Sequence, residues 1–314
     1  MYQGHFGLDK EPFRLVPDPG FLYLSNKHAK AKTYLDFAIW NRDGFVVVTG
    51  EIGSGKTTIL NSVLSELDDS VVVCKIHQTL LTESQLIKAV LTELHVAKPG
   101  SDKVELLKRL TEVLLEYHNI GKKVILVIDE AQNLGVKALE EIRLLSELEA
   151  NYERLLNIIL VGQPELKKLL DSPELEQLAQ RIRLRFHLRA LSEEETADYI
   201  DKRIEIAGLA KQEIIPHELV PLIYRYTGGI PRLINILCDT ALVIAYAENK
   251  KSVSVEILKE SIRELQWVTF KRRKARVRER RKMLKKSETH NTSLTTALDE
   301  LPLDIDLAKL EHKE

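Results

Sequence analysis

The sequence is poor in cysteine and has no long apolar run. Its 314 residues include only two cysteines, Cys74 and Cys238, which stand far apart in apolar surroundings. This excludes a disulfide scaffold and predicts two buried, reduced thiols, as in a cytosolic protein. No run reaches the roughly 18 apolar residues that a membrane-spanning helix needs. The first ten residues contain no basic segment followed by an apolar stretch, so no secretory signal is visible and a cytoplasmic protein is expected.

An overall excess of charge of one sign is also missing. The sequence has 46 basic and 47 acidic side chains, so its total charge points to no particular partner. The distribution is uneven, because residues 271–286 hold eleven Lys and Arg against one Glu. Residues 287–314 are acidic and rich in Ser and Thr, and we predict a mostly disordered tail there. The remaining composition is that of a globular protein of about two domains.

Strand and helix patterns alternate through much of the chain. Short apolar runs predict four strands, at Phe45–Thr49, Val71–Ile76, Val124–Ile128 and Leu156–Val161. A fifth strand is predicted at Arg183–Leu188, where apolar and polar residues alternate. Helical spacing lies between the strands, including a predicted helix at Lys137–Glu149. The alternation predicts an α/β core over residues 40–190, with a five-stranded parallel sheet covered on both faces.

Different patterns flank this core. Residues 1–39 predict an extended arm, rich in Pro and aromatic residues, and a first helix. After the core, Ser192 and Glu195 form a capping-box pattern, and helical periodicity without strands continues to about residue 265. We therefore predict a small all-α domain over residues 191–266, followed by a basic helical extension over residues 267–286.

A phosphate-binding motif lies between the first predicted strand and the helix after it. The segment Gly50-Glu51-Ile52-Gly53-Ser54-Gly55-Lys56-Thr57-Thr58 contains G-x-x-x-x-G-K-[ST]. Its glycines let the backbone curl so that successive N–H groups face phosphate oxygens, and the helix N-terminus adds partial positive charge. Lys56 is expected to neutralise the β- and γ-phosphates, and the Thr57 hydroxyl to ligate Mg²⁺. The segment predicts a nucleotide site.

Two acids, Asp129 and Glu130, follow the predicted strand Val124–Ile128. They would lie at the carboxyl edge of the sheet, where open α/β sheets bind ligands. Asp129 is expected to hold Mg²⁺ through water and Glu130 to polarise the attacking water, with Gln132 and Asn133 as candidate helpers. An acid directly after the magnesium Asp is typical of P-loop ATPases that use a strand-end Glu as catalytic base. No N-K-x-D guanine signature follows the loop, which favours ATP over GTP.

Several further motifs accompany the loop and the acid pair. They are Phe6-Gly-Leu, Pro12-Phe13, Pro17-Asp18-Pro19, Phe21-Leu-Tyr23-Leu-Ser25, Asp129-Glu-Ala-Gln132-Asn-Leu, Val161-Gly-Gln163-Pro164-Glu165-Leu, Gln180-Arg181-Ile and Gly228-Gly-Ile-Pro231-Arg232. Together they resemble the AAA+ ATPases of the general secretion pathway protein A (ExeA) type, related to MshM and to exosortase-associated ATPases. The resemblance covers roughly residues 3–266, and a more distant one links the chain to the TniB/TnsC transposition ATPases.

The resemblance implies an AAA+ core with a helical lid, and roles for further residues. Gln163 would be sensor 1, which orients the lytic water, and Arg232 would be sensor 2, which reaches from the lid to the γ-phosphate. Arg181 would be an arginine finger for a neighbouring subunit, with Arg183 and Arg185 as alternatives. The arm and lid would enclose the adenine, with contacts from Phe6 or Tyr23.

The basic block at residues 271–286 has three interpretations, which the sequence leaves open. It could be a solvated helix extension, a site for the anionic inner face of a membrane, or a site for nucleic acid phosphates. We predict an AAA+ ATPase that binds ATP with Mg²⁺ and assembles into a homo-oligomer, either a ring or a nucleotide-dependent dimer. Core–lid motion would act on a partner in secretion, pilus or envelope assembly. The alternatives are an ATP-gated DNA-binding regulator of the TniB/TnsC type and a switch with negligible turnover.

Overall fold

The computed structural model describes residues 1–16, 19–21, 23–41, 44–77, 80–97, 100, 102–208, 214–276 and 279. Contacts divide the chain into two units, Met1–Gln266 and Trp267–Glu314. The predicted acidic tail, the basic block beyond residue 276 except Glu279, and Pro17, Asp18 and Leu22 of the arm motifs lie outside the described residues.

Five parallel strands form the central sheet, in the spatial order β2-β3-β6-β1-β7. The strands are β1 (Phe45–Gly50), β2 (Val71–Ile76), β3 (Lys123–Ile128), β6 (Leu156–Gly162) and β7 (Leu184–Leu188). Each was predicted within one residue of its observed ends. The sheet confirms the predicted fold class, a P-loop core of AAA+ type that helices follow.

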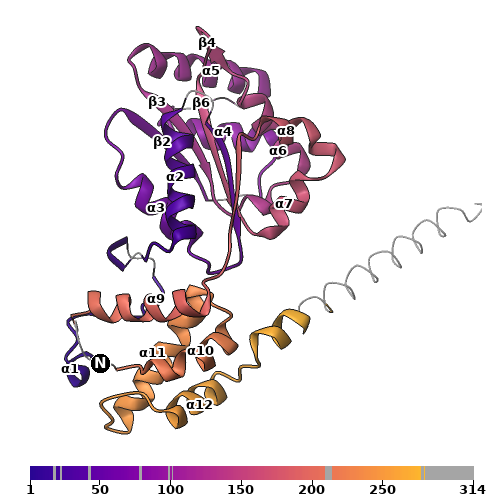
Figure 1. The fold of residues 1–314 in the computed structure, drawn as a ribbon. Coiled ribbons are helices and arrows are strands. Elements are labelled where there is room, and N and C mark those ends of the chain that lie inside the picture. Colours follow the sequence, from indigo (N-terminus) through magenta and orange to yellow (C-terminus); the bar gives the residue numbers. More distant parts are fainter. Residues whose placement is uncertain are drawn as a thin grey trace, which may run out of the picture. The chain divides into compact units, whose positions relative to one another are not determined.

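Helices cover both faces of this sheet (Figure 1). One face packs on α2 (Asn26–Trp40) and α3 (Lys56–Leu64). The other packs on α4 (Glu83–Glu93), α5 (Lys103–Asn119), α6 (Val136–Leu145), α7 (Pro164–Leu170) and α8 (Glu176–Arg181). Successive strand residues alternate between the two buried clusters: Val46 and Val48 face the first, whereas Val47 faces the second. Burial on both faces explains why the strands are continuous apolar runs.

Among the described residues of the first unit, the elements that follow β7 are all helical. They are α9 (Glu193–Ile206), the 3₁₀ turn η4 (His217–Leu219), α10 (Val220–Thr227), α11 (Pro231–Ala247) and α12 (Val255–Glu264). The capping box predicted at Ser192 and Glu195 starts α9. Between residues 193 and 264, the described residues contain no strand. Among all described residues, no helix combines the length and apolar character needed to cross a membrane.

The N-terminal arm differs from the predicted extended segment. It contains a one-turn helix, α1 (Gln3–Phe6), and a 3₁₀ turn, η1 (Pro19–Phe21). The arm packs on the helices after β7: Tyr2 Oη donates to Asp239 Oδ1 at 2.6 Å, and the backbone N–H of Asp9 donates to the carbonyl of Ala207 at 2.7 Å. The first residues of the chain therefore pack against residues about two hundred positions later in the sequence.

The prediction for residues 137–149 was too long. Helix α6 ends at Leu145, and a two-stranded hairpin follows, β4 (Glu149–Ala150) and β5 (Glu153–Arg154). Its two turn residues, Asn151 and Tyr152, have φ of 51° and 66°. Hairpin turns of this kind favour Gly, which is absent here, so the usual sequence signal for the turn is missing.

Candidate functional site

The phosphate loop connects the end of β1 to the start of α3. Gly55, at the N-cap, has φ of 95°, a left-handed conformation that favours glycine. Among the described residues, no side chain caps α3. The first N–H groups of α3 have no partner within the helix, since the first such bond is donated by Ile59 to Gly55. The loop therefore presents N–H donors and the positive end of a helix dipole, which suit an anion.

Lys56 turns back onto this loop. Its Nζ donates to the carbonyls of Gly50 and Glu51, at 2.9 and 3.0 Å. Burial lowers the pKa of Lys56, although the nearby acids Glu130, Asp129 and Glu51 favour its charged form. The ammonium group thus lies at the loop on carbonyl contacts that phosphate oxygens could replace.

Thr57 and Asp129 bring a hydroxyl and a carboxylate together. The Thr57 hydroxyl donates to Asp129 Oδ2 at 2.9 Å, and the other carboxylate oxygen accepts the N–H of Glu130. Hydroxyl and carboxylate oxygens are the hard ligands that Mg²⁺ takes, directly or through bound water. The chemistry of this donor pair therefore fits Mg²⁺.

Glu130 is held by two amide side chains. Its Oε2 accepts from Gln132 Nε2 at 2.6 Å and from Gln163 Nε2 at 3.0 Å, while Gln132 Oε1 accepts the backbone N–H of Gln163. Partial burial raises the pKa of Glu130, but these two hydrogen bonds and the charge of Lys56 outweigh it, so the net pKa is lowered. Glu130 is thus an ionised acceptor at neutral pH. Its φ of 54° is rare for a residue other than Gly and is typical of functional sites.

Helix α11 contacts the phosphate loop at Arg232. Its backbone N–H donates to the carbonyl of Gly53 at 3.2 Å. A Cβ atom on Gly53 would lie 2.5 Å from Cβ of Arg232, so only glycine permits this approach. The family resemblance implies that the Arg232 side chain reaches the γ-phosphate; the structure shows the backbone of Arg232 in contact with the loop.

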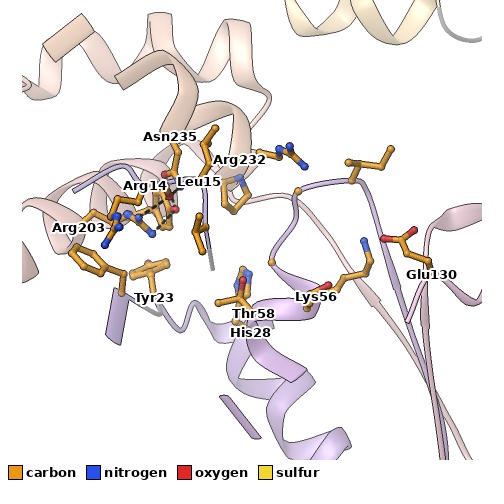
Figure 2. Close-up of a pocket in the computed structure, with 18 residues that line it drawn as sticks. Arg14, Leu15, Tyr23, His28, Lys56, Thr58, Glu130, Arg203, Arg232 and Asn235 are labelled. Carbon is orange, nitrogen blue, oxygen red and sulfur yellow. Dashed lines mark hydrogen bonds between the residues drawn. The ribbon is translucent and has the colours of Figure 1, made fainter. Parts of the chain in front are cut away.

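Lys56, Thr57, Glu130 and Arg232 border one cavity of about 230 Å³, whose lining extends from the loop to the arm, α9 and α11 (Figure 2). Asp129 and Gln163 are not among the residues that line it. At the loop the cavity is lined by Ile52, Gly53, Gly55, Lys56, Thr57, Thr58, Glu130 and Arg232. Beyond the loop its walls come from the arm and from α9 and α11: Arg14, Leu15, Val16, Phe21, Tyr23, Tyr199, Arg203, Pro231 and Asn235. His28 of α2 lies between the two ends. We call the first part the phosphate end and the second part the base end.

A buried polar network, absent from the sequence predictions, closes the base end. Arg203 donates to the carbonyl of Pro12, to that of Arg14 at 3.3 Å and to Tyr199 Oη at 3.3 Å. Its guanidinium lies 4.8 Å from the ring centre of Phe21. Asn235 accepts from Tyr199 Oη at 2.8 Å and donates to the same Arg14 carbonyl. In the sequence, the one sign of this network is Arg203, which stands among the apolar positions of a helix. An arginine whose side chain is solvated would give the same pattern.

Of the remaining residues predicted for the site, one lines the cavity and the others lie elsewhere. Tyr23 lines the base end, but Phe6 is buried in the arm and does not line the cavity. Arg181 pairs with Glu147 at 2.6 Å and borders a different cavity with Arg183, near the first residues of β1 and β6. Because the strands are parallel and the phosphate loop follows the end of β1, Arg181 lies at the opposite edge of the sheet. Arg185 pairs with Asp171.

Comparisons with known proteins agree with this geometry. A family profile described as "AAA domain" matches residues 40–170. General secretion pathway protein A of Aeromonas hydrophila is 39% identical over 254 residues, which are 81% of this chain and 46% of that protein. The chain thus spans about half the length of this relative.

Solved structures share the fold at low sequence identity. CDC6P from Pyrobaculum aerophilum has a TM-score of 0.63 and 20% identity, over 79% of this chain and 71% of that one. The ORC2 protein of Aeropyrum pernix has a TM-score of 0.60 and 17% identity, over 82% and 72%. The RuvB Holliday junction branch migration motor of Thermotoga maritima has a TM-score of 0.51 and 18% identity, over 76% and 69%. Residues 40–170 thus match an AAA domain, which implies nucleotide binding, and the chain is similar to general secretion pathway protein A over 81% of its length.

Proposed function

We propose that the protein binds ATP with Mg²⁺ in this cavity and hydrolyses it. The observation that carries the proposal is the continuity of the cavity, which joins an anion-binding loop, an ionised carboxylate and a partly apolar chamber. The phosphate end suits a polyphosphate and the base end suits a flat heterocycle. A nucleoside triphosphate carries both groups, and the absence of an N-K-x-D motif favours adenine.

The residues at the phosphate end divide the chemistry between them. The loop N–H groups and Lys56 would bind the phosphates, and Arg232 would contribute charge from the lid side. Thr57 and Asp129 would hold Mg²⁺, which would neutralise charge developing on the phosphate oxygens. Glu130, kept ionised by Gln132, Gln163 and Lys56, would accept a hydrogen bond from the attacking water and take its proton.

Substitution Glu130→Gln tests this assignment. It keeps the shape of the side chain and removes the basic carboxylate, so turnover should fall by about 10²–10⁴. ATP affinity should stay within a few fold, because the binding groups at the loop are unchanged. Glu174→Gln, an exposed substitution distant from the cavity, is the matched control. Undiminished hydrolysis by the Glu130→Gln protein would reject Glu130 as the base.

We further propose that the active form is a homo-oligomer, in which Arg181 acts on the nucleotide of a neighbouring subunit. Its position at the sheet edge opposite its own phosphate loop supports action between subunits. Glu130→Gln and Arg181→Ala proteins should each be inactive alone. Their mixture should recover part of the turnover, because some interfaces then pair an intact Glu130 with an intact Arg181. No recovery at any protein concentration would contradict the proposal.

The movement between core and lid and the identity of the partner protein are also proposals. We infer that residues 40–190 and 191–266 act as a core and a lid whose relative movement follows the nucleotide state. The name of the Aeromonas hydrophila relative supports a partner in a secretion or envelope system. A pull-down with the ATP-loaded Glu130→Gln protein would identify it. Location in the cytoplasm, at the inner face of the membrane, stays a prediction.

A second function, ATP-gated DNA binding, is favoured by one observation in the second unit. Residues 270–276 are helical and include Lys271, Arg272, Arg273, Lys274 and Arg276. Arg273 lies 4.5 Å from the ring centre of Trp267, and Lys274 lies 5.8 Å from that of Phe270. This cluster could bind nucleic acid or anionic lipid. DNA affinity that depends on ATP near 0.1 M salt would support the DNA function, and its absence would eliminate it.

A further inference from the structure

The carbonyl groups of the phosphate loop accept hydrogen bonds from side chains and from the backbone of α11. Lys56 holds those of Gly50 and Glu51, as described above, and the backbone N–H of Arg232 holds that of Gly53. The next carbonyl, of Ser54, lies 3.2 Å from Nε2 of His28. Among the described residues, Lys56 and His28 are the side chains that hold these carbonyls. A bound phosphate would compete for Lys56 but leaves His28 in place.

The hydrogen bonds of His28 define its tautomer. A carbonyl oxygen only accepts, so Nε2 must carry the proton that it donates to Ser54. Nδ1 then accepts from the Ser25 hydroxyl, 2.7 Å away. Ser25 is the N-cap of α2, and its oxygen also accepts the backbone N–H of His28. The imidazole is 4% exposed, so its orientation is fixed on both sides.

This contact sets the direction of one loop N–H. The carbonyl of Ser54 and the N–H of Gly55 belong to one planar trans peptide, in which the two groups point in opposite directions. With the carbonyl turned to His28, the Gly55 N–H turns away from α2. Gly55 lies at the N-cap of α3, beside the N–H groups that face the phosphate site.

We propose that His28 is a positioning residue that locks the Ser54–Gly55 peptide with its N–H toward the bound phosphates. The inference rests on the proposed nucleotide site and assigns a role within it to a residue outside the loop motif. Two facts separate this role from simple packing. The Ser54 carbonyl would lose its described partner if His28 were apolar, and Gly55 has the unrestricted φ range that lets such a peptide rotate. Without the imidazole, the loop would populate orientations that do not bind.

Two substitutions at position 28 separate the hydrogen bond from the volume. His28→Gln keeps an N–H donor in place of Nε2, whereas His28→Leu fills the space without a donor. Binding of ATP and of inorganic tripolyphosphate is measured by calorimetry, with thermal unfolding recorded for each protein. We expect His28→Leu to bind both ligands about tenfold more weakly and His28→Gln to stay within about threefold of the natural protein. Ser25→Ala, which loosens the imidazole, should give an intermediate loss.

The outcomes distinguish failure of the inference from failure of the proposed function. If the natural protein binds neither ligand, the nucleotide site itself is wrong. If it binds both and His28→Leu binds them equally well, or if the Gln and Leu proteins lose affinity alike, His28 does not act by holding the peptide. If His28→Leu does not fold, Ser25→Ala carries the test, and unchanged tripolyphosphate affinity in that protein would overturn the inference.

Discussion

The phosphate end and the base end of the cavity are built in different ways. The phosphate end consists of backbone N–H groups, Lys56 and two acids, and its loop comes from nine consecutive residues. The base end is assembled from the arm and from α9 and α11, whose contacting residues are separated by about two hundred positions. The first end carries a recurrent motif, and the second depends on side chains brought together from distant parts of the sequence.

The two ends of the cavity therefore depend on different parts of the structure. The phosphate end is built on the carboxyl ends of β1 and β3, and under the proposed function we expect it to bind a polyphosphate by itself. The base end exists only while the arm packs on the helices after β7, because Arg203 and Asn235 both hold arm carbonyls. Ligands with and without a base should therefore respond differently to changes at the two ends.

Lys56→Ala should have the largest effect, and at the phosphate end. It removes the ammonium group beside the loop, so ATP and tripolyphosphate should both lose affinity by about 100-fold or more, as expected for a charge-assisted contact. Calorimetry with each ligand measures this. The exposed Lys108→Ala, on α5, is the control for loss of a lysine. Equal binding of tripolyphosphate by the Lys56→Ala protein would place the polyphosphate elsewhere.

Arg203→Leu should separate the two ends. It leaves the carbonyls of Pro12 and Arg14 without this donor, so the free energy of unfolding should fall by about 1–3 kcal/mol. ATP should bind about tenfold more weakly because the chamber wall loosens, while tripolyphosphate affinity should not change. Lys202→Leu, one position earlier and exposed, is a matched control. Equal losses for both ligands would contradict the division into two ends.

Tyr199→Phe should have a smaller effect at the base end. It removes the hydroxyl that donates to Asn235 and accepts from Arg203, but it keeps the ring. The expected loss of unfolding free energy is about 1 kcal/mol, the ordinary contribution of a buried hydrogen bond. Chemical denaturation measures it. No loss, or a loss equal to that of Arg203→Leu, would show that the hydroxyl is not part of one network with the arginine.

Mild acid should give the smallest effect, through His28. Burial lowers the pKa of His28 below its ordinary value of 6.5, although the hydrogen bond to Ser54 and the charge of Glu195 oppose this. The unfolded chain therefore binds more protons than the folded one as the pH falls below about 6.5, and stability must decrease there. The slope for one proton cannot exceed about 1.4 kcal/mol per pH unit.

Burial also lowers the pKa of His187. This second histidine therefore also makes the free energy of unfolding decrease as the pH falls. The comparison of the natural protein with His28→Gln isolates the part due to His28. Denaturation curves between pH 5 and 7 should be less pH-dependent for the Gln protein. An identical pH dependence would mean that His28 is protonated as easily in the folded protein as in the unfolded chain.

Local patterns predicted the sheet and the phosphate end because both are encoded in short segments. Four strands are mainly apolar runs and β7 alternates apolar with polar residues, while Lys56 and Asp129 lie at fixed places relative to strand ends. The hairpin at β4 and β5 was missed, because a turn made by Asn151 and Tyr152 lacks the glycine that marks such turns.

Long-range polar contacts could not be predicted in this way. Asn157, in the central strand β6, is buried and donates to the carbonyls of Ala38 and Asn41 at the end of α2. In the sequence it is one polar residue in an apolar run. Arg203 is a similar case in a helix, because the carbonyls that it binds lie about 190 residues earlier in the chain. No rule of sequence spacing connects these residues.

The attachment of the arm to the far helices has a practical consequence for handling this protein. Tyr2 is buried and bonded to Asp239, and His5 contacts the carbonyl of Lys250. A clone that starts at the first strand would delete the arm residues that line the cavity, among them Arg14, Phe21 and Tyr23. Such a protein would keep every residue of the phosphate loop, and under the proposed function its weaker ATP binding would be mistaken for an inactive enzyme.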